Sequence, residues 1–163
     1  LQIHGGYVMF KLYPESANRF TDVEKLRNYI NGGKGVITLL SPSGVHHTYY
    51  YKKPRNPNEF PEDVIFVYAV HGGNKLFYVG MIEQGHFRLT RSSRFNYNTE
   101  IVKGAVFIMQ ILSGSRDINK TQMTIQHEGM CSVCGRKLTS PKSLITGLGP
   151  RCARKLNDVQ LFR

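Results

Sequence analysis

The chain has 163 residues and a mass of 18.6 kDa, which suits one domain with a small appended module, and 40% of its residues are hydrophobic, enough to build a core. Its 22 Lys and Arg outnumber 11 Asp and Glu, and the resulting net charge of +11 argues against mimicry of DNA, which needs an acidic surface. No apolar run approaches the roughly 18 residues that span a membrane, so we expect a cytoplasmic protein.

The first predicted element is an amphipathic helix near the N-terminus. Residues 1–8 have neither the basic nor the apolar region of a signal peptide, and we interpret them as a leader or expression remnant before Met9. Thr21-Asp22-Val23-Glu24 fits a capping box, and the apolar residues that follow share one helical face. Gly32-Gly33 is expected to end this helix.

Five segments rich in apolar, aromatic and β-branched residues predict strands. Turn residues separate them, which favours a largely antiparallel sheet. Segment 52–61 contains three prolines and predicts an exposed loop. The strands are expected at residues 36–40, 45–51, 64–70, 76–82 and 86–90.

A second helix is expected after the last strand. Apolar residues recur at helical spacing from Ile101 to Leu112, with Asn96 or Asn98 as candidate caps. We expect this helix to lie across the sheet. The fold class predicted for residues 9–114 is therefore α+β, an antiparallel sheet of about five strands with two helices, and the polar residues 115–124 are interpreted as a linker.

All three cysteines lie in one C-terminal stretch, with the spacing His-x3-Cys-x2-Cys-x17-Cys. These side chains form the ligand set of a closed tetrahedral zinc site, so the predicted metal ligands are His127, Cys131, Cys134 and Cys152. The fourth ligand stays open, because His71, His86, an aspartate or a water are alternatives to His127. A disulfide, or inert buried thiols, would be the non-metal interpretation.

Local signals around the cysteines predict a small zinc-knuckle module over residues 125–163. Gly135 can adopt the strained backbone that a tight Cys-x2-Cys turn requires. Thr139 or Ser140 can cap a short helical turn that ends at Gly147. Pro150 suits the first position of a second helix, which would carry Cys152 in its first turn.

The same stretch resembles a family of unknown function that is common in bacteriophages and actinobacteria. Its members tend to contain Cys-x-x-Cys-Gly-Arg-x-Leu-Thr-x-Pro-x-Ser followed by Gly-x-Gly-Pro-x-Cys, and residues 131–153 of this chain follow that motif closely. The resemblance implies a zinc-binding module and a phage or prophage origin. It implies no activity and no catalytic residue.

Basic residues are concentrated near the cysteines and in two upstream segments. The 49 residues after Gly114 contain nine Lys or Arg against three Asp or Glu, a pattern typical of polyanion binding, although solvated lysines and arginines would give the same composition. The segment around residues 86–97 interleaves arginines with aromatic rings, and if these arginines share a surface with Tyr97 and the tyrosines 49–51, that surface suits a single strand. The candidate nucleic-acid-binding residues are Lys52, Lys53, Arg55, Arg88, Arg91, Arg94, Arg136, Lys137, Arg151, Arg154 and Lys155.

These patterns favour a zinc-containing, basic, phage-type accessory protein that binds nucleic acid without catalysis in the host cytoplasm. One alternative is a protein-interaction module, or an inhibitor of a host factor, with a purely structural zinc. Another is a nucleic-acid-processing enzyme with a site built from scattered histidines and Glu83 or Asp63. The zinc-deaminase signature, the Walker loop and the serine-nucleophile elbow are absent from the sequence. The histidines concerned are His46, His47, His71 and His86.

Overall fold

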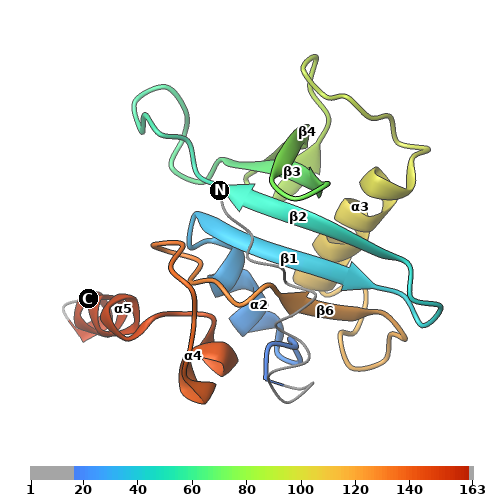
Figure 1. The fold of residues 1–163 in the computed structure, drawn as a ribbon. Coiled ribbons are helices and arrows are strands. Elements are labelled where there is room, and N and C mark those ends of the chain that lie inside the picture. Colours follow the sequence, from blue (N-terminus) through green and yellow to red (C-terminus); the bar gives the residue numbers. More distant parts are fainter. Residues whose placement is uncertain (1–16, 162–163) are drawn as a thin grey trace.

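The computed structural model describes residues 17–161 as an α+β fold around one six-stranded antiparallel sheet (Figure 1). Residues 1–8, interpreted above as a remnant, lie outside the described range. The strand order is β5-β4-β3-β2-β1-β6, so the last strand in the sequence pairs with the first. The strands are β1 (Lys34–Leu40), β2 (His46–Lys52), β3 (Ile65–His71), β4 (Lys75–Glu83), β5 (His86–Arg88) and β6 (Thr124–His127).

The α+β prediction is confirmed, and the sheet has one strand more than the five expected. β6 comes from the region assigned by sequence to the start of the C-terminal module, and it pairs with β1 from Ile37↔His127 to Leu40↔Thr124. Its outer side makes an isolated bridge between Gln126 and Arg19. At the opposite margin of the sheet, β5 has only three residues.

Helices α2 (Val23–Ile30) and α3 (Glu100–Ser113) cover the same face of the sheet (Figure 1). Their apolar sides and the inward side chains of the strands form the main core, because alternate residues of a strand point to opposite faces. Tyr49 and Tyr51 of β2 point into this core, whereas Tyr50 between them points to the other face. We call that other face the open face.

The caps of both helices differ from those predicted. The carboxylate of Asp22, and not Thr21, accepts from the backbone N–H of Glu24 and begins α2. For α3 the N-cap is Thr99, whose hydroxyl oxygen accepts from the N–H of Val102. Asp22 and Thr99 each directly precede their helix and have extended backbone, which is the geometry that an N-cap residue requires.

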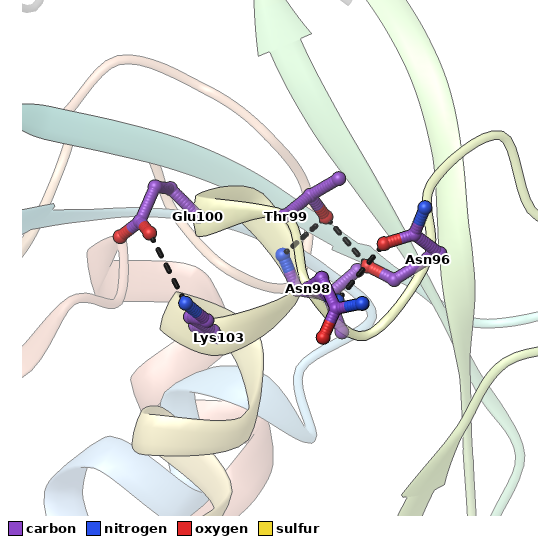
Figure 2. Close-up of polar contacts among 6 residues, drawn as sticks. Asn96, Asn98, Thr99, Glu100 and Lys103 are labelled. Carbon is purple, nitrogen blue, oxygen red and sulfur yellow. Dashed lines mark hydrogen bonds and ion pairs between the residues drawn. The ribbon is translucent and has the colours of Figure 1, made fainter.

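Figure 2 shows why an asparagine is nevertheless present before α3. Asn96 forms a turn, in which its Oδ1 accepts from the N–H of Asn98 at 2.9 Å and its carbonyl accepts from the Thr99 hydroxyl at 2.7 Å. Glu100 and Lys103 form an ion pair along the first turn at 3.4 Å. The asparagine therefore orients the residue that caps the helix.

Within residues 17–161, no helix combines the length and apolar character needed to cross a bilayer.

Candidate metal centre and basic grooves

A tight hairpin, which we call the knuckle (residues 130–137), follows β6 and carries the first two cysteines. Met130 bridges to Lys137, and the N–H of Cys131 donates to the carbonyl of Arg136 at 2.8 Å. Gly135 has φ +77°, a left-handed conformation that a side chain would disfavour. The Cys-x2-Cys turn thus forms as its glycine indicated.

Two helices bring the third cysteine to the knuckle. α4 (Pro141–Thr146) begins at Ser140, whose hydroxyl accepts from the N–H of Ser143 at 3.2 Å, and ends at Gly147 with φ +71°. α5 (Pro150–Leu161) then begins with proline at its first position and holds Cys152 in its first turn. These helix limits agree with the sequence prediction, because each is set by a residue within the same short segment.

The three cysteine sulfurs lie within 4.8 Å of one another, so they can hold a metal ion. Within residues 17–161 no other group of three or more His, Cys, Asp and Glu side chains is gathered in this way. Cys131 is buried, Cys152 is half-buried and Cys134 is exposed. The cluster therefore lies at the protein surface, with Cys131 on its buried side and Cys134 on its solvent side.

The environment of the thiols fits a cation. Burial raises the pKa of Cys131, but hydrogen bonds from the backbone of Cys134, Gly149 and Val133 outweigh it and leave that pKa below its ordinary value. Burial, together with smaller contributions from the neighbouring Cys131 and Cys134, raises the pKa of Cys152 to about 11. Backbone amides thus favour the thiolate form of Cys131, and its negative charge disfavours a second thiolate at Cys152. A bound divalent cation would remove this repulsion between the two thiolates.

His127, predicted as the fourth ligand, is not part of this group. Its ring is 1% exposed, its Nδ1 accepts from the N–H of Gly129 at 3.0 Å, and its Nε2 contacts the carbonyl oxygen of Leu144. It stacks on Tyr29 with a centroid distance of 5.2 Å. Because both nitrogens have partners, the geometry favours a packing role, and ligation by His127 stays a sequence-based prediction.

The knuckle packs closely on the first part of the fold. The Tyr29 hydroxyl donates to the carbonyl of Met130 at 2.9 Å, and the N–H of Lys34 donates to the carbonyl of Ser132 at 2.7 Å. A Cβ on Gly32 would lie 2.3 Å from the Ser132 hydroxyl, and one on Gly147 would lie 2.5 Å from the Tyr29 ring. These contacts require glycine at both positions and fix the cluster against β1 and α2.

Two basic grooves meet at the knuckle. The first, the sheet groove, has a volume of about 870 Å³ and lies between the knuckle and the sheet. The second, the helix groove, has a volume of about 530 Å³ and lies between the knuckle and the start of α5. Both are lined by Cys134, Arg136 and Lys137. Among the residues that the structure describes, no Asp or Glu lines either groove.

Eight of the eleven predicted nucleic-acid-binding residues line these grooves. Lys52, Lys53 and Arg55 lie in the sheet groove, Arg151, Arg154 and Lys155 lie in the helix groove, and Arg136 and Lys137 are shared. Sequence reasoning missed Lys34, which also lines the sheet groove. The sequence signal that could have indicated Lys34 is its position directly after Gly32-Gly33, at the start of β1.

Three of the predicted arginines are not brought to these grooves. Arg88 lies on β5, at the margin of the sheet opposite β6, and pairs with Glu83 at 3.3 Å. Arg94 lies over the ring of Phe77, 5.6 Å from its centroid. Arg91 is exposed in the same loop.

The scattered histidines do not gather into a metal-type site either. His46 and His47 lie on β2, His71 ends β3 and His86 lies on β5. Burial lowers the pKa of His47, and the charge of Glu100 acts in the opposite direction. No set of three ligand atoms from these strands lies together within the described part of the chain.

Residues 122–157 match a family described as a family of unknown function (DUF6011). The matched residues run from the start of β6 into α5 and include all three cysteines. The match supports the expected resemblance to a family without assigned function, and it covers the C-terminal part of the chain alone. No curated protein and no solved structure matches the chain.

Proposed function

We propose that this chain binds nucleic acid through the two basic grooves, and that its three cysteines hold a structural zinc ion. The observation that carries the proposal is the convergence of nine Lys and Arg on two adjoining grooves that no Asp or Glu lines among the described residues. Phosphate groups are the ligands that such a surface favours, because each neutralised phosphate releases counterions.

The exposed ends of the basic side chains support this interpretation over an internal structural role. Lys53, Arg136 and Arg154 are exposed, and the ion pairs observed at arginines involve Arg27 and Arg88 on other surfaces. A single strand or a duplex backbone could follow the sheet groove, pass Arg136 and Lys137, and continue along the helix groove. Contacts of this kind set the position of the ligand without reading its sequence.

Zinc is the proposed metal because thiolates are its common ligands in structural sites and the three sulfurs already converge. When bound, it would hold Cys131, Cys134 and Cys152 together as a crosslink. The consequence for function is indirect. Cys134 lies beside both grooves, so a fixed knuckle keeps Arg136 and Lys137 where the grooves meet.

A salt titration of binding tests the proposal. The probes are fluorescein-labelled oligonucleotides of about 20 residues, single-stranded and duplex, followed by fluorescence anisotropy. We expect log K to fall against log salt with a slope of about −0.7 per contacted phosphate on a single strand or about −0.9 on a duplex. An absence of binding, or binding that salt does not weaken, would refute the proposal and favour a protein partner.

Charge reversal locates the surface. Lys53→Glu and Arg136→Glu should each weaken binding and make the salt slope shallower by roughly one to two phosphates. Lys25→Glu is the matched control, because Lys25 is exposed on α2, which covers the opposite face. An equal loss with Lys25→Glu would show that net charge, and not the grooves, drives association.

The biological setting is part of the same proposal and rests on the motif resemblance. We propose a phage or prophage accessory protein that acts in the host cytoplasm without catalysis.

A further inference from the structure

We propose, on the basis of the proposed function, that the ligand is single-stranded nucleic acid whose bases stack on a row of aromatic rings across the open face. The row consists of Tyr50, Tyr68 and Tyr78, with Phe66 and Phe60 beside it, and we call it the aromatic ladder. The sequence predicted the tyrosines 49–51 and the segment around residues 86–97 as the stacking surface, and of these residues only Tyr50 belongs to the ladder.

The sheet register builds the ladder. Tyr50 of β2 is directly opposite Tyr68 of β3, which is opposite Tyr78 of β4. Directly opposed residues point to the same face, so the three rings lie side by side, with centroid distances of 6.2 and 5.7 Å. Phe66 continues the row 6.2 Å from Tyr78, and Phe60 lies 5.1 Å from Phe66.

The ladder belongs to the face that α2 and α3 leave uncovered. The core under these helices contains Tyr49 and Tyr51, whereas Tyr50 and Tyr68 belong to a separate small cluster with Val36 and Met130. Tyr50 is 7% exposed and is the covered end, and Tyr68, Tyr78 and Phe66 are half-buried. Rings in this state present an edge or face to the solvent while packing holds them in place.

The ladder is continuous with the sheet groove. Tyr50 lines that groove together with Lys52 and Arg55. Burial and the neighbouring Tyr68 raise the pKa of Tyr50, and the charge of Arg55 acts in the opposite direction. A phosphate-binding surface therefore adjoins a base-stacking surface, the combination that single-strand-binding proteins use.

The spacing of the rings favours a single strand over a duplex. Bases stacked in a duplex follow one another at about 3.4 Å along each strand and present no free face to a protein side chain. Rings 5.7 to 6.2 Å apart instead suit bases that have separated from one another. The charge of the groove then neutralises the backbone that carries them.

The deciding experiment compares two ligands with the same charge. One is an oligodeoxythymidylate of about 12 residues, and the other is an abasic oligodeoxynucleotide of equal length. We expect the oligothymidylate to bind roughly ten-fold more tightly or better, because one stacked base contributes about that factor. The chain has nine Tyr and no Trp, so quenching of tyrosine emission by the oligothymidylate alone reports the stacking directly.

Variants identify the rings that stack. Tyr68→Phe should keep the preference for the base-bearing ligand, whereas Tyr68→Leu should remove most of it and leave the affinity for the abasic ligand unchanged. That unchanged affinity also shows that the variant is folded, and Phe66→Leu repeats the test if Tyr68→Leu does not fold. Tyr97→Leu is the matched control, because Tyr97 is 57% exposed and lies in the loop between β5 and α3.

The outcomes separate this inference from the proposed function. Equal affinity for the two oligomers would overturn the stacking inference while the basic grooves keep their role. Binding to neither would overturn both. A loss caused by Tyr97→Leu and not by Tyr68→Leu or Phe66→Leu would move the platform to the β5 margin and overturn the aromatic ladder.

Discussion

The buried imidazole of His127 should make the fold sensitive to acid. Its Nδ1 accepts from the N–H of Gly129, so in the neutral ring the proton is on Nε2 and is donated to the carbonyl of Leu144. Burial lowers the pKa of His127 from 6.5 to about 4, and the contact with Leu144 offsets only part of that effect. Protonation would add a proton at Nδ1, so this nitrogen could no longer accept the hydrogen bond from the Gly129 N–H.

The sign and size of the effect follow from the difference in pKa between the two states. The folded pKa lies below that of the unfolded chain, so the stabilisation is complete above pH 6.5 and is lost as the pH falls through about 4. A shift from 6.5 to about 4 corresponds to about 3 kcal/mol in the free energy of unfolding. For a domain of this size, that is a substantial part of the total stability.

The assay is urea unfolding of the wild type and His127→Gln between pH 7 and pH 4. The glutamine can still donate to Leu144 but does not titrate, so we expect the variant to be less stable at pH 7 and to lose about 3 kcal/mol less on acidification. Acid also protonates thiolates and releases metal from both proteins, and the comparison cancels this shared effect. Parallel pH dependences would refute the reasoning, and a variant that no longer holds metal would identify His127 as a ligand.

Three further predictions concern the metal, the close contact at Gly147 and the cap of α3. Cys152→Ser should abolish stoichiometric zinc in elemental analysis and lower the melting temperature by several degrees, and an unchanged melting temperature would contradict a structural metal. Gly147→Ala should cost about 2 kcal/mol or more in urea unfolding because its Cβ meets the Tyr29 ring, whereas Gly44→Ala, also at positive φ but with nothing within 4 Å, should cost about 1 kcal/mol. Thr99→Ala should cost about 1 kcal/mol through loss of the α3 cap, and a neutral effect would assign the capping to solvent.

Local features of the fold could be predicted from the sequence. Ser140, Gly147 and Pro150 each act within a few residues, and the limits of α4 and α5 agree with them. The three cysteines converge as their spacing indicated, because the Cys-x2-Cys turn and the start of α5 are both short-range structures.

Features that depend on distant partners could not be predicted in the same way. The pairing of β6 with β1 joins residues about ninety positions apart, and the apolar content of so short a strand gives no indication of its partner. The packing of His127 against Tyr29 likewise depends on the whole fold, and the spacing that predicts His127 as a metal ligand gives no indication of this contact. The aromatic ladder is also a product of register, since alternation alone does not say which tyrosines become neighbours.

The two margins of the sheet limit self-association. Unpaired backbone along an outer strand is a template on which a second chain can add and polymerise. Here one margin is only three residues long, and the other is partly occupied by the bridge from Arg19 to Gln126. Concentrated preparations should therefore stay monodisperse, and a variant trimmed to remove the segment around Arg19 should be the first to form fibrils.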